Sequence, residues 1–171
     1  TYLPLTAYYL SEQENILDNI ARGKAIYQRM KKEHPFLTSS EDSVFAVLLA
    51  CSGKDEDVLM HDMEECYRLL KEKFSAGNHI QTVSHILSLA DGAAFEKVDR
   101  LIQLYDALQQ SGRKYGKYHE LAVLASLSMM NGNIQDMVGD MLDADAFLST
   151  QKGYGFWGLD KKSRLMHAAM I

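Results

Sequence analysis

The sequence predicts an all-α protein built from paired helices that recur about every forty residues. Apolar residues recur at intervals of three and four along most of the chain, which is the spacing of one helix face. No segment shows the alternation of apolar and polar residues that is typical of a half-buried strand. Gly53, Gly92 and Gly132 each follow an apolar run, and they lie about forty residues apart.

Eight helical segments are predicted. Their approximate ranges, in chain order, are 16–30, 44–51, 59–74, 80–90, 95–108, 121–130, 134–148 and 160–171. The second segment is apolar on nearly every side, which is typical of a helix buried all round. Gly112 and Gly153 follow helical segments, and we expect them to end those helices in the left-handed conformation.

Residues 38–42 predict the start of a helix. Either Thr38 and Glu41 or Ser39 and Asp42 can form a reciprocal capping pair. Pro35 lies just upstream and disfavours continuation of the preceding helix.

The forty-residue period indicates the architecture. A single helical hairpin cannot cover its own apolar face, so it needs a neighbour on each side. We therefore predict about four stacked hairpins in an α-solenoid-like arrangement, within one domain over residues 1–171. The alternative is an irregular helical bundle.

Composition restricts the partners. The 171 residues include 18 Lys and Arg against 23 Asp and Glu, a formal charge of −5, which disfavours non-specific nucleic-acid binding. No apolar run approaches the roughly 18 residues of a membrane helix, so we expect no membrane partner. Cys51 and Cys66 lie in helical patterns and are interpreted as reduced core thiols, which favours a cytoplasmic location.

Several short strings resemble a known family. They are residues 34–38 (His-Pro-Phe-Leu-Thr) with Glu41-Asp42 and residues 48–50, Gly77-Asn78 with Gln81 and residues 84–87 (Ser-His-Ile-Leu), and Asp160-Lys161 with Ala168-Ala169. They resemble the bacterial family called domain of unknown function 4003, from about Tyr27 to Ile171. Members of that family are longer, so the resemblance implies the C-terminal part of a bacterial, cytoplasmic, helical protein. It implies no activity.

Asn78, Gln81 and His85 form the first candidate site. Projected at about 100° per residue, the three side chains fall together, opposite the apolar face of their helix. Two amides and an imidazole could hold a small polar ligand or a partner's backbone. Alternatively, Asn78 and Gln81 form a capping box and His85 lies at the surface or between repeats.

The second candidate site is the loop at residues 152–158, which holds Tyr154, Phe156 and Trp157. Such aromatic side chains often dominate protein interfaces. Alternatively, the loop only connects two helices, and Phe156 and Trp157 fill a neighbouring groove. It lacks the Gly-Lys-Ser/Thr ending of a phosphate-binding loop, and no strand precedes it.

Catalytic and metal-binding patterns are weak. His61 and Glu65 share a helix face, but spacing supplies no third zinc ligand. No Gly-x-Ser-x-Gly string is present. An apolar run around Cys51 raises a thiol pKa and lowers its reactivity, and Cys66 lies on a core stripe. We therefore predict no catalytic residue, no metal site and no cofactor.

Four of the nine methionines, Met129, Met130, Met137 and Met141, lie close together in the sequence. At helical spacing they indicate core packing. A flexible methionine face can instead serve binding.

These observations favour a helical-repeat module that binds or scaffolds a protein or peptide. The rival hypothesis is a small-ligand-binding protein or an enzyme that uses Asn78, Gln81 and His85, with His85 as acid or base. A third possibility is a purely structural, oligomerising domain.

Overall fold

The computed structural model describes residues 3–155 and 158–171, without the side chains of Leu3 and Leu5. The described residues are helical and contain no strand, which confirms the all-α prediction. The nine helices of this part are α1 (Leu3–Ser11), α2 (Ile16–Glu33), α3 (Asp42–Cys51), α4 (Glu56–Lys73), α5 (Asn78–Leu89), α6 (Ala94–Gln110), α7 (His119–Ser128), α8 (Ile134–Ser149) and α9 (Lys161–Ala168).

Long and short helices alternate after α1. The helices α2, α4, α6 and α8 have 18, 18, 17 and 16 residues, whereas α3, α5, α7 and α9 have 10, 12, 10 and 8. All eight predicted segments correspond to one of these helices. The sequence analysis missed α1, whose residues carry no clear apolar face and include Pro4. Proline is tolerated there because the first turn of a helix donates no backbone hydrogen bond.

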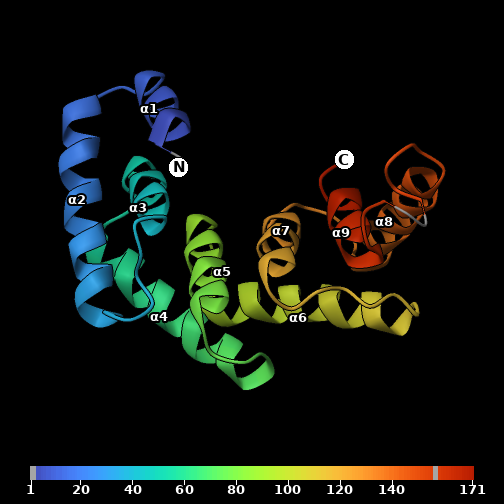
Figure 1. Ribbon diagram of the computed structural model, residues 1–171. Helices are drawn as coiled ribbons and strands as arrows, with labels where there is room; N and C mark the ends of the chain where they lie inside the picture. Colours follow the sequence, from blue (N-terminus) through green and yellow to red (C-terminus); the bar gives the residue numbers. More distant parts are fainter. Residues whose placement is uncertain (1–2, 156–157) are drawn as a thin grey trace. The chain divides into compact units, whose positions relative to one another are not determined.

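The chain divides into two compact units, unit 1 (residues 1–94) and unit 2 (residues 95–171). Within unit 1, α3 packs against both α2 and α5, and α4 packs against α5 (Figure 1). The short helix α1 contacts α2 and α3. Within unit 2, α9 packs against α7 and α8. The single domain and the stacked repeat remain predictions.

Buried apolar side chains hold α2, α3 and α4 together. Ile26, Leu49 and Leu59 have no exposed surface and belong to one core cluster of unit 1. The α2–α3 contact is close at Gly23, where an added Cβ would lie 3.3 Å from Cγ2 of Val47. Glycine therefore lets the two helices approach each other, which offsets its poor helix propensity.

The predicted helix ends are confirmed at two glycines. Gly112 has φ 80° and Gly153 has φ 93°, in the left-handed region that glycine adopts without strain. The predicted start at residues 38–42 is only half a capping box. Asp42 Oδ2 accepts from the Ser39 backbone N–H at 2.7 Å, but α3 begins at Asp42 without a side-chain cap in return.

The same arginine contact occurs in both units. Arg22 on α2 donates to the carbonyls of Ala50 and Lys54, at 2.8 and 2.5 Å. These two residues lie 28 and 32 positions beyond Arg22 in the sequence. Arg100 on α6 donates to the carbonyls that lie 28 and 32 residues beyond it, at 2.6 and 2.8 Å. A cation at a helix C-terminus satisfies otherwise unpaired carbonyls and complements the helix dipole. Each arginine therefore fixes the end of a short helix.

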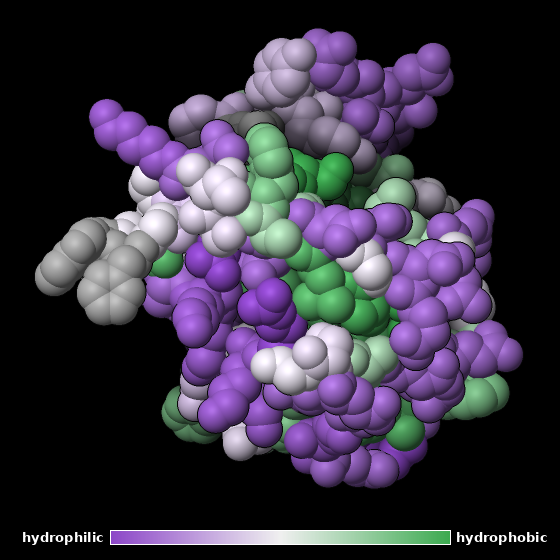
Figure 2. Space-filling model, turned by 90° about the vertical axis from the view of Figure 1, so that its right-hand side faces the viewer, coloured by the Kyte–Doolittle hydropathy of each residue, from purple (hydrophilic) through white to green (hydrophobic). Residues whose placement is uncertain are grey.

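The face shown in Figure 2 is mostly hydrophilic. On the face shown in Figure 2, an apolar area is exposed between polar side chains. None of the described helices is both long and apolar enough to cross a membrane.

Candidate functional site

The structure separates the residues of the first predicted site. Asn78 is exposed at the first position of α5, whereas Gln81 and His85 are each only 2% exposed. The prediction of a shared stripe opposite the core is therefore wrong for Gln81 and His85. Because α5 packs against both α3 and α4, its polar side is buried as well. The capping alternative is also wrong, since Gly77 occupies the N-cap position and no side chain caps α5.

Gln81 joins α5 to the segment that precedes α3. Its Nε2 donates to Oγ1 of Thr38 at 3.0 Å, and Thr38 Oγ1 donates to the Met30 carbonyl at 3.1 Å. The Gln81 Oε1 atom is buried and has no hydrogen-bond partner. The amide is therefore half satisfied, at the cost of one desolvated acceptor.

His85 lies in the same buried region. Its Nδ1 has no hydrogen-bond partner and lies 3.7 Å from Oδ1 of Asp42, beyond hydrogen-bonding distance. Its ring packs against Phe45, with centroids 5.6 Å apart. Burial and, to a smaller extent, the nearby His34 lower the pKa of His85 to about 3. The imidazole is therefore neutral at physiological pH, with one protonated and one unprotonated ring nitrogen.

His34 lies close to this buried region but reaches the surface. Its Nε2 bonds Oε1 of Glu64, and its ring lies 5.1 Å from the Tyr67 ring. The buried contacts support a packing role for Gln81 and His85 between α3 and α5. A ligand role for either residue stays a prediction.

The second predicted site is described only at Tyr154, because Phe156 and Trp157 lie outside the described residues. Tyr154 is half-buried, and its hydroxyl hydrogen-bonds Nδ1 of His167 on α9 at 2.8 Å. Its carbonyl accepts from Arg164 at 3.2 Å. Tyr154 therefore attaches this loop to α9 within unit 2, and its role in binding stays a prediction.

The remaining chemical candidates have local structural roles. Burial raises the pKa of the Cys51 thiol. Arg68 donates to both oxygens of Glu65, at 3.0 and 2.7 Å, and this hydrogen bonding lowers the pKa of Glu65. Among the described residues, no three His, Cys, Asp or Glu side chains lie together as a metal site would require.

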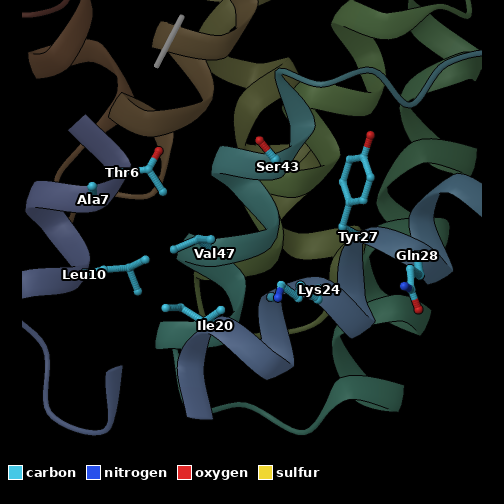
Figure 3. A pocket seen from close by; sticks show the side chains of 10 residues that line it. Thr6, Ala7, Leu10, Ile20, Lys24, Tyr27, Gln28, Ser43 and Val47 are labelled. Carbon is cyan, nitrogen blue, oxygen red and sulfur yellow. The ribbon is translucent and has the colours of Figure 1, made fainter. Parts of the chain in front are cut away.

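A groove on unit 1 is a further candidate site. It has a volume of about 330 Å³ and lies between α1, α2 and α3. Its lining, which defines the unit 1 groove, consists of Thr6, Ala7, Leu10, Ile20, Gly23, Lys24, Tyr27, Gln28, Ser43 and Val47. Figure 3 shows Leu10, Ile20 and Val47, one from each helix, gathered on one side of it. Its size is at the lower end of the range for ligand-binding clefts.

The face of α2 along the groove combines apolar and basic side chains. Leu17, Lys24 and Lys31 follow one another at seven-residue spacing, which places them on one side of the helix. Leu17 is 81% exposed, and both lysines are exposed. Neither lysine forms an ion pair with the described part of the chain. This face therefore suits a ligand with apolar groups and negative charge.

Sequence reasoning missed this groove because one of its walls is α1. The sequence does contain a signal for this face, in Leu17 and the lysines that follow it at seven-residue spacing. The periodicity of α2 predicts only which side of the helix is buried, so this exposed side was not identified.

Comparison with known proteins gives the family. The model of the family described as protein of unknown function (DUF4003) matches residues 1–171. The match covers the whole chain, so it does not support the prediction of a C-terminal part. The chain is also 35% identical over 150 residues to the uncharacterized protein YeaA of Bacillus subtilis (strain 168). The aligned region covers 85% of this chain and 45% of that protein. The chain thus spans about half the length of this curated relative. No solved structure matches. The chain belongs to the DUF4003 family of proteins of unknown function.

Proposed function

We propose that this chain is a helical-repeat module that binds a peptide segment of another protein, and that the unit 1 groove is the binding site. The ligand is an amphipathic segment with bulky apolar side chains and carboxylates. The observation that carries the proposal is an apolar groove between three helices that is lined by Lys24, with Lys31 on the same side of α2. Neither lysine forms an ion pair within the described residues.

The apolar part of the groove supplies the binding energy. Burial of a leucine-sized side chain contributes about 1.5–3 kcal/mol, and the groove offers Leu10, Ile20 and Val47 as contacts. Leu17 extends the apolar surface along α2. Helices that present such a groove commonly bind an amphipathic helix through anchors at three- and four-residue spacing.

The lysines beside the groove favour a ligand with negative charge. The chain as a whole has a charge of −5, so long-range repulsion opposes the binding of an acidic ligand. Acidic ligands are therefore expected only where lysines are concentrated locally, as at Lys24 and Lys31. Binding of an acidic probe is for this reason a sharper test than binding of a basic one.

The test uses the 171-residue chain and a fluorescein-labelled idealised helix of leucine and glutamate, measured by fluorescence anisotropy. We expect binding that weakens about tenfold when Lys24→Gln and Lys31→Gln are combined, because each ion pair contributes about 0.2–1 kcal/mol. The matched control combines Lys161→Gln and Lys162→Gln on α9, which removes the same charge elsewhere and should change binding less than about twofold.

A second variant tests the apolar wall. Ala7 lies on the groove and is exposed, so Ala7→Phe fills the groove without altering the core. The proposal predicts loss of binding with an unchanged circular dichroism spectrum. Equal binding by wild type, the lysine variant and the Ala7 variant would show that the groove is not the site.

The proposal includes the forty-residue helical repeat, a bacterial cytoplasmic location and a protein partner rather than nucleic acid. The repeat is supported by the alternation of long and short helices and by the arginine contact common to both units. The location is supported by the free thiols of Cys51 and Cys66 on different helices, and the partner class by the net charge.

A further inference from the structure

A second groove lies on unit 2 and differs from the first in its chemistry. We propose that it binds a basic amphipathic helix of a partner protein. This inference is independent of the proposed function of unit 1, because it rests on other residues and predicts the opposite charge in the ligand.

The groove is larger than that of unit 1, at about 600 Å³, and it is formed by the ends of α7 and α9 and by one side of α8. Its lining, which defines the unit 2 groove, consists of Leu127, Met130, Asn131, Met137, Asp140, Met141, Ala144, Ala168, Ala169, Met170 and Ile171. Four of these residues are methionines, and most of the others are aliphatic or alanine.

The methionines are only partly used by the fold. Met141 is buried at 2% exposure, whereas Met130 and Met170 are 60% and 66% exposed. Methionine is unbranched and polarizable, so an exposed methionine wall adapts to bulky apolar side chains of a docked helix. The expectation that these methionines form ordinary core is therefore correct for Met141 and wrong for Met130.

An acidic stripe borders the groove. Asp136, Asp140 and Asp143 recur at four and three residues along α8, so they share one side of that helix. All three are exposed, and none forms an ion pair with the described part of the chain. Met137 and Ala144 follow directly after Asp136 and Asp143, so the methionine wall runs beside the carboxylates.

The methionine wall and the acidic stripe together indicate the chemistry of the ligand. Apolar anchors fill the methionine wall, and Lys or Arg side chains on the flank of the same helix reach the three carboxylates. An acidic helix would instead face three like charges, which disfavours it. A flat apolar ligand would leave the carboxylates without partners. A basic amphipathic helix satisfies both features.

The test uses the 171-residue chain and a labelled idealised helix of leucine and lysine. We expect the combined Asp136→Asn, Asp140→Asn and Asp143→Asn variant to weaken binding about tenfold. The matched control, Glu12→Gln, Glu14→Gln and Asp18→Asn, removes three charges from exposed positions of unit 1 and should change binding less than about threefold. Equal losses in the two variants would indicate attraction by net charge alone and overturn the proposal.

Two further variants test the apolar wall. Ala144→Phe fills the groove and should abolish binding, and Met130→Gln, at an exposed position, should weaken it even if Ala144→Phe does not fold. Retention of binding by a folded Ala144→Phe variant, or by Met130→Gln, contradicts the proposal. Dimerisation of the chain alone that Met130→Gln abolishes would also contradict it, because a second copy would then be the occupant.

Discussion

The two units bury polar groups in opposite ways. In unit 1, His85 is buried with no hydrogen bond at Nδ1, and Gln81 is buried with no partner for Oε1. In unit 2, Asp145 is 2% exposed, and Arg164 pairs with both of its oxygens, at 2.7 and 3.4 Å. Arg113 lies 3.5 Å from the second oxygen. Substitution of these equally buried residues therefore changes stability by different amounts. Removal of Asp145 leaves a buried arginine without its counter-charge, whereas removal of the His85 ring takes away a nitrogen that has no hydrogen-bond partner.

The largest expected effect is in unit 2. Asp145→Ala leaves Arg164, whose side chain is only 12% exposed, without its carboxylate. Removal of one member of a buried pair costs about 3–5 kcal/mol, so we expect the free energy of unfolding to fall by that amount. Urea denaturation followed by circular dichroism measures it. Asp143→Ala is the control, since Asp143 is exposed and forms no ion pair with the residues that the structure describes, and its effect should stay within about 0.5 kcal/mol. Equal effects would show that the Asp145 pair adds no stability.

The next effect is a pH dependence in unit 1. The pKa of His85 is about 3 in the folded chain, against about 6.5 when unfolded. Between these values the unfolded chain binds one more proton, so stability is fully present above pH 6.5 and is lost as pH falls toward 3. We expect a loss of about 1.4 kcal/mol per pH unit between pH 6 and 4 from this residue.

The measurement is urea denaturation at several pH values in wild type and His85→Leu. The variant should lose this part of the pH slope, because it leaves the neighbouring Asp42, at 3.7 Å, and His34 unchanged. Identical slopes would show that His85 remains able to bind a proton in the folded chain.

A smaller effect is expected at the arginine contact of unit 2. Arg100→Met removes the donors for carbonyls at and beyond the end of α7, and we expect a cost of about 2 kcal/mol. Arg68→Met is the comparison, because Arg68 forms only exposed pairs with Glu65 and Glu72 and should cost less than about 1 kcal/mol. Thermal unfolding of both variants measures the difference, and a larger cost for Arg68→Met would contradict the account.

The smallest expected effect returns to unit 1. At pH 7, His85→Leu removes a buried imidazole nitrogen that has no hydrogen-bond partner and replaces it with an apolar side chain of similar size. We expect the free energy of unfolding to change by less than about 1 kcal/mol, in either direction. A loss above about 3 kcal/mol at neutral pH would mean that His85 makes a stabilising contact in the folded chain.

The sequence predicted helices well where one face is buried. The stripe of Leu59, Met63 and Leu70 predicts α4 because buried and exposed positions alternate with the helical period. The helix α1 was missed because it has no such contrast. The same reasoning failed at α5, since a helix packed on two sides buries polar residues that a one-face model places outside. Gln81 and His85 are two such residues, which were expected at the surface and are buried.

The candidate grooves could not be predicted from the sequence for a related reason. A groove needs three helices at a specific separation, and periodicity gives only the face of each helix. The unit 1 groove depends on α1 lying against α2 and α3. The charge of each rim was nevertheless present in the sequence, in Lys24 and Lys31 and in the aspartates of α8.

The central claim is that the two units carry separate grooves with opposite charge preference. The most direct test is a ¹H–¹⁵N correlation NMR titration of the labelled 171-residue chain with the leucine–glutamate helix and, separately, with the leucine–lysine helix. The account predicts that the acidic helix shifts amide signals of α1, α2 and α3, and that the basic helix shifts those of α7, α8 and α9. Shifts of one common set of signals by both helices would contradict it.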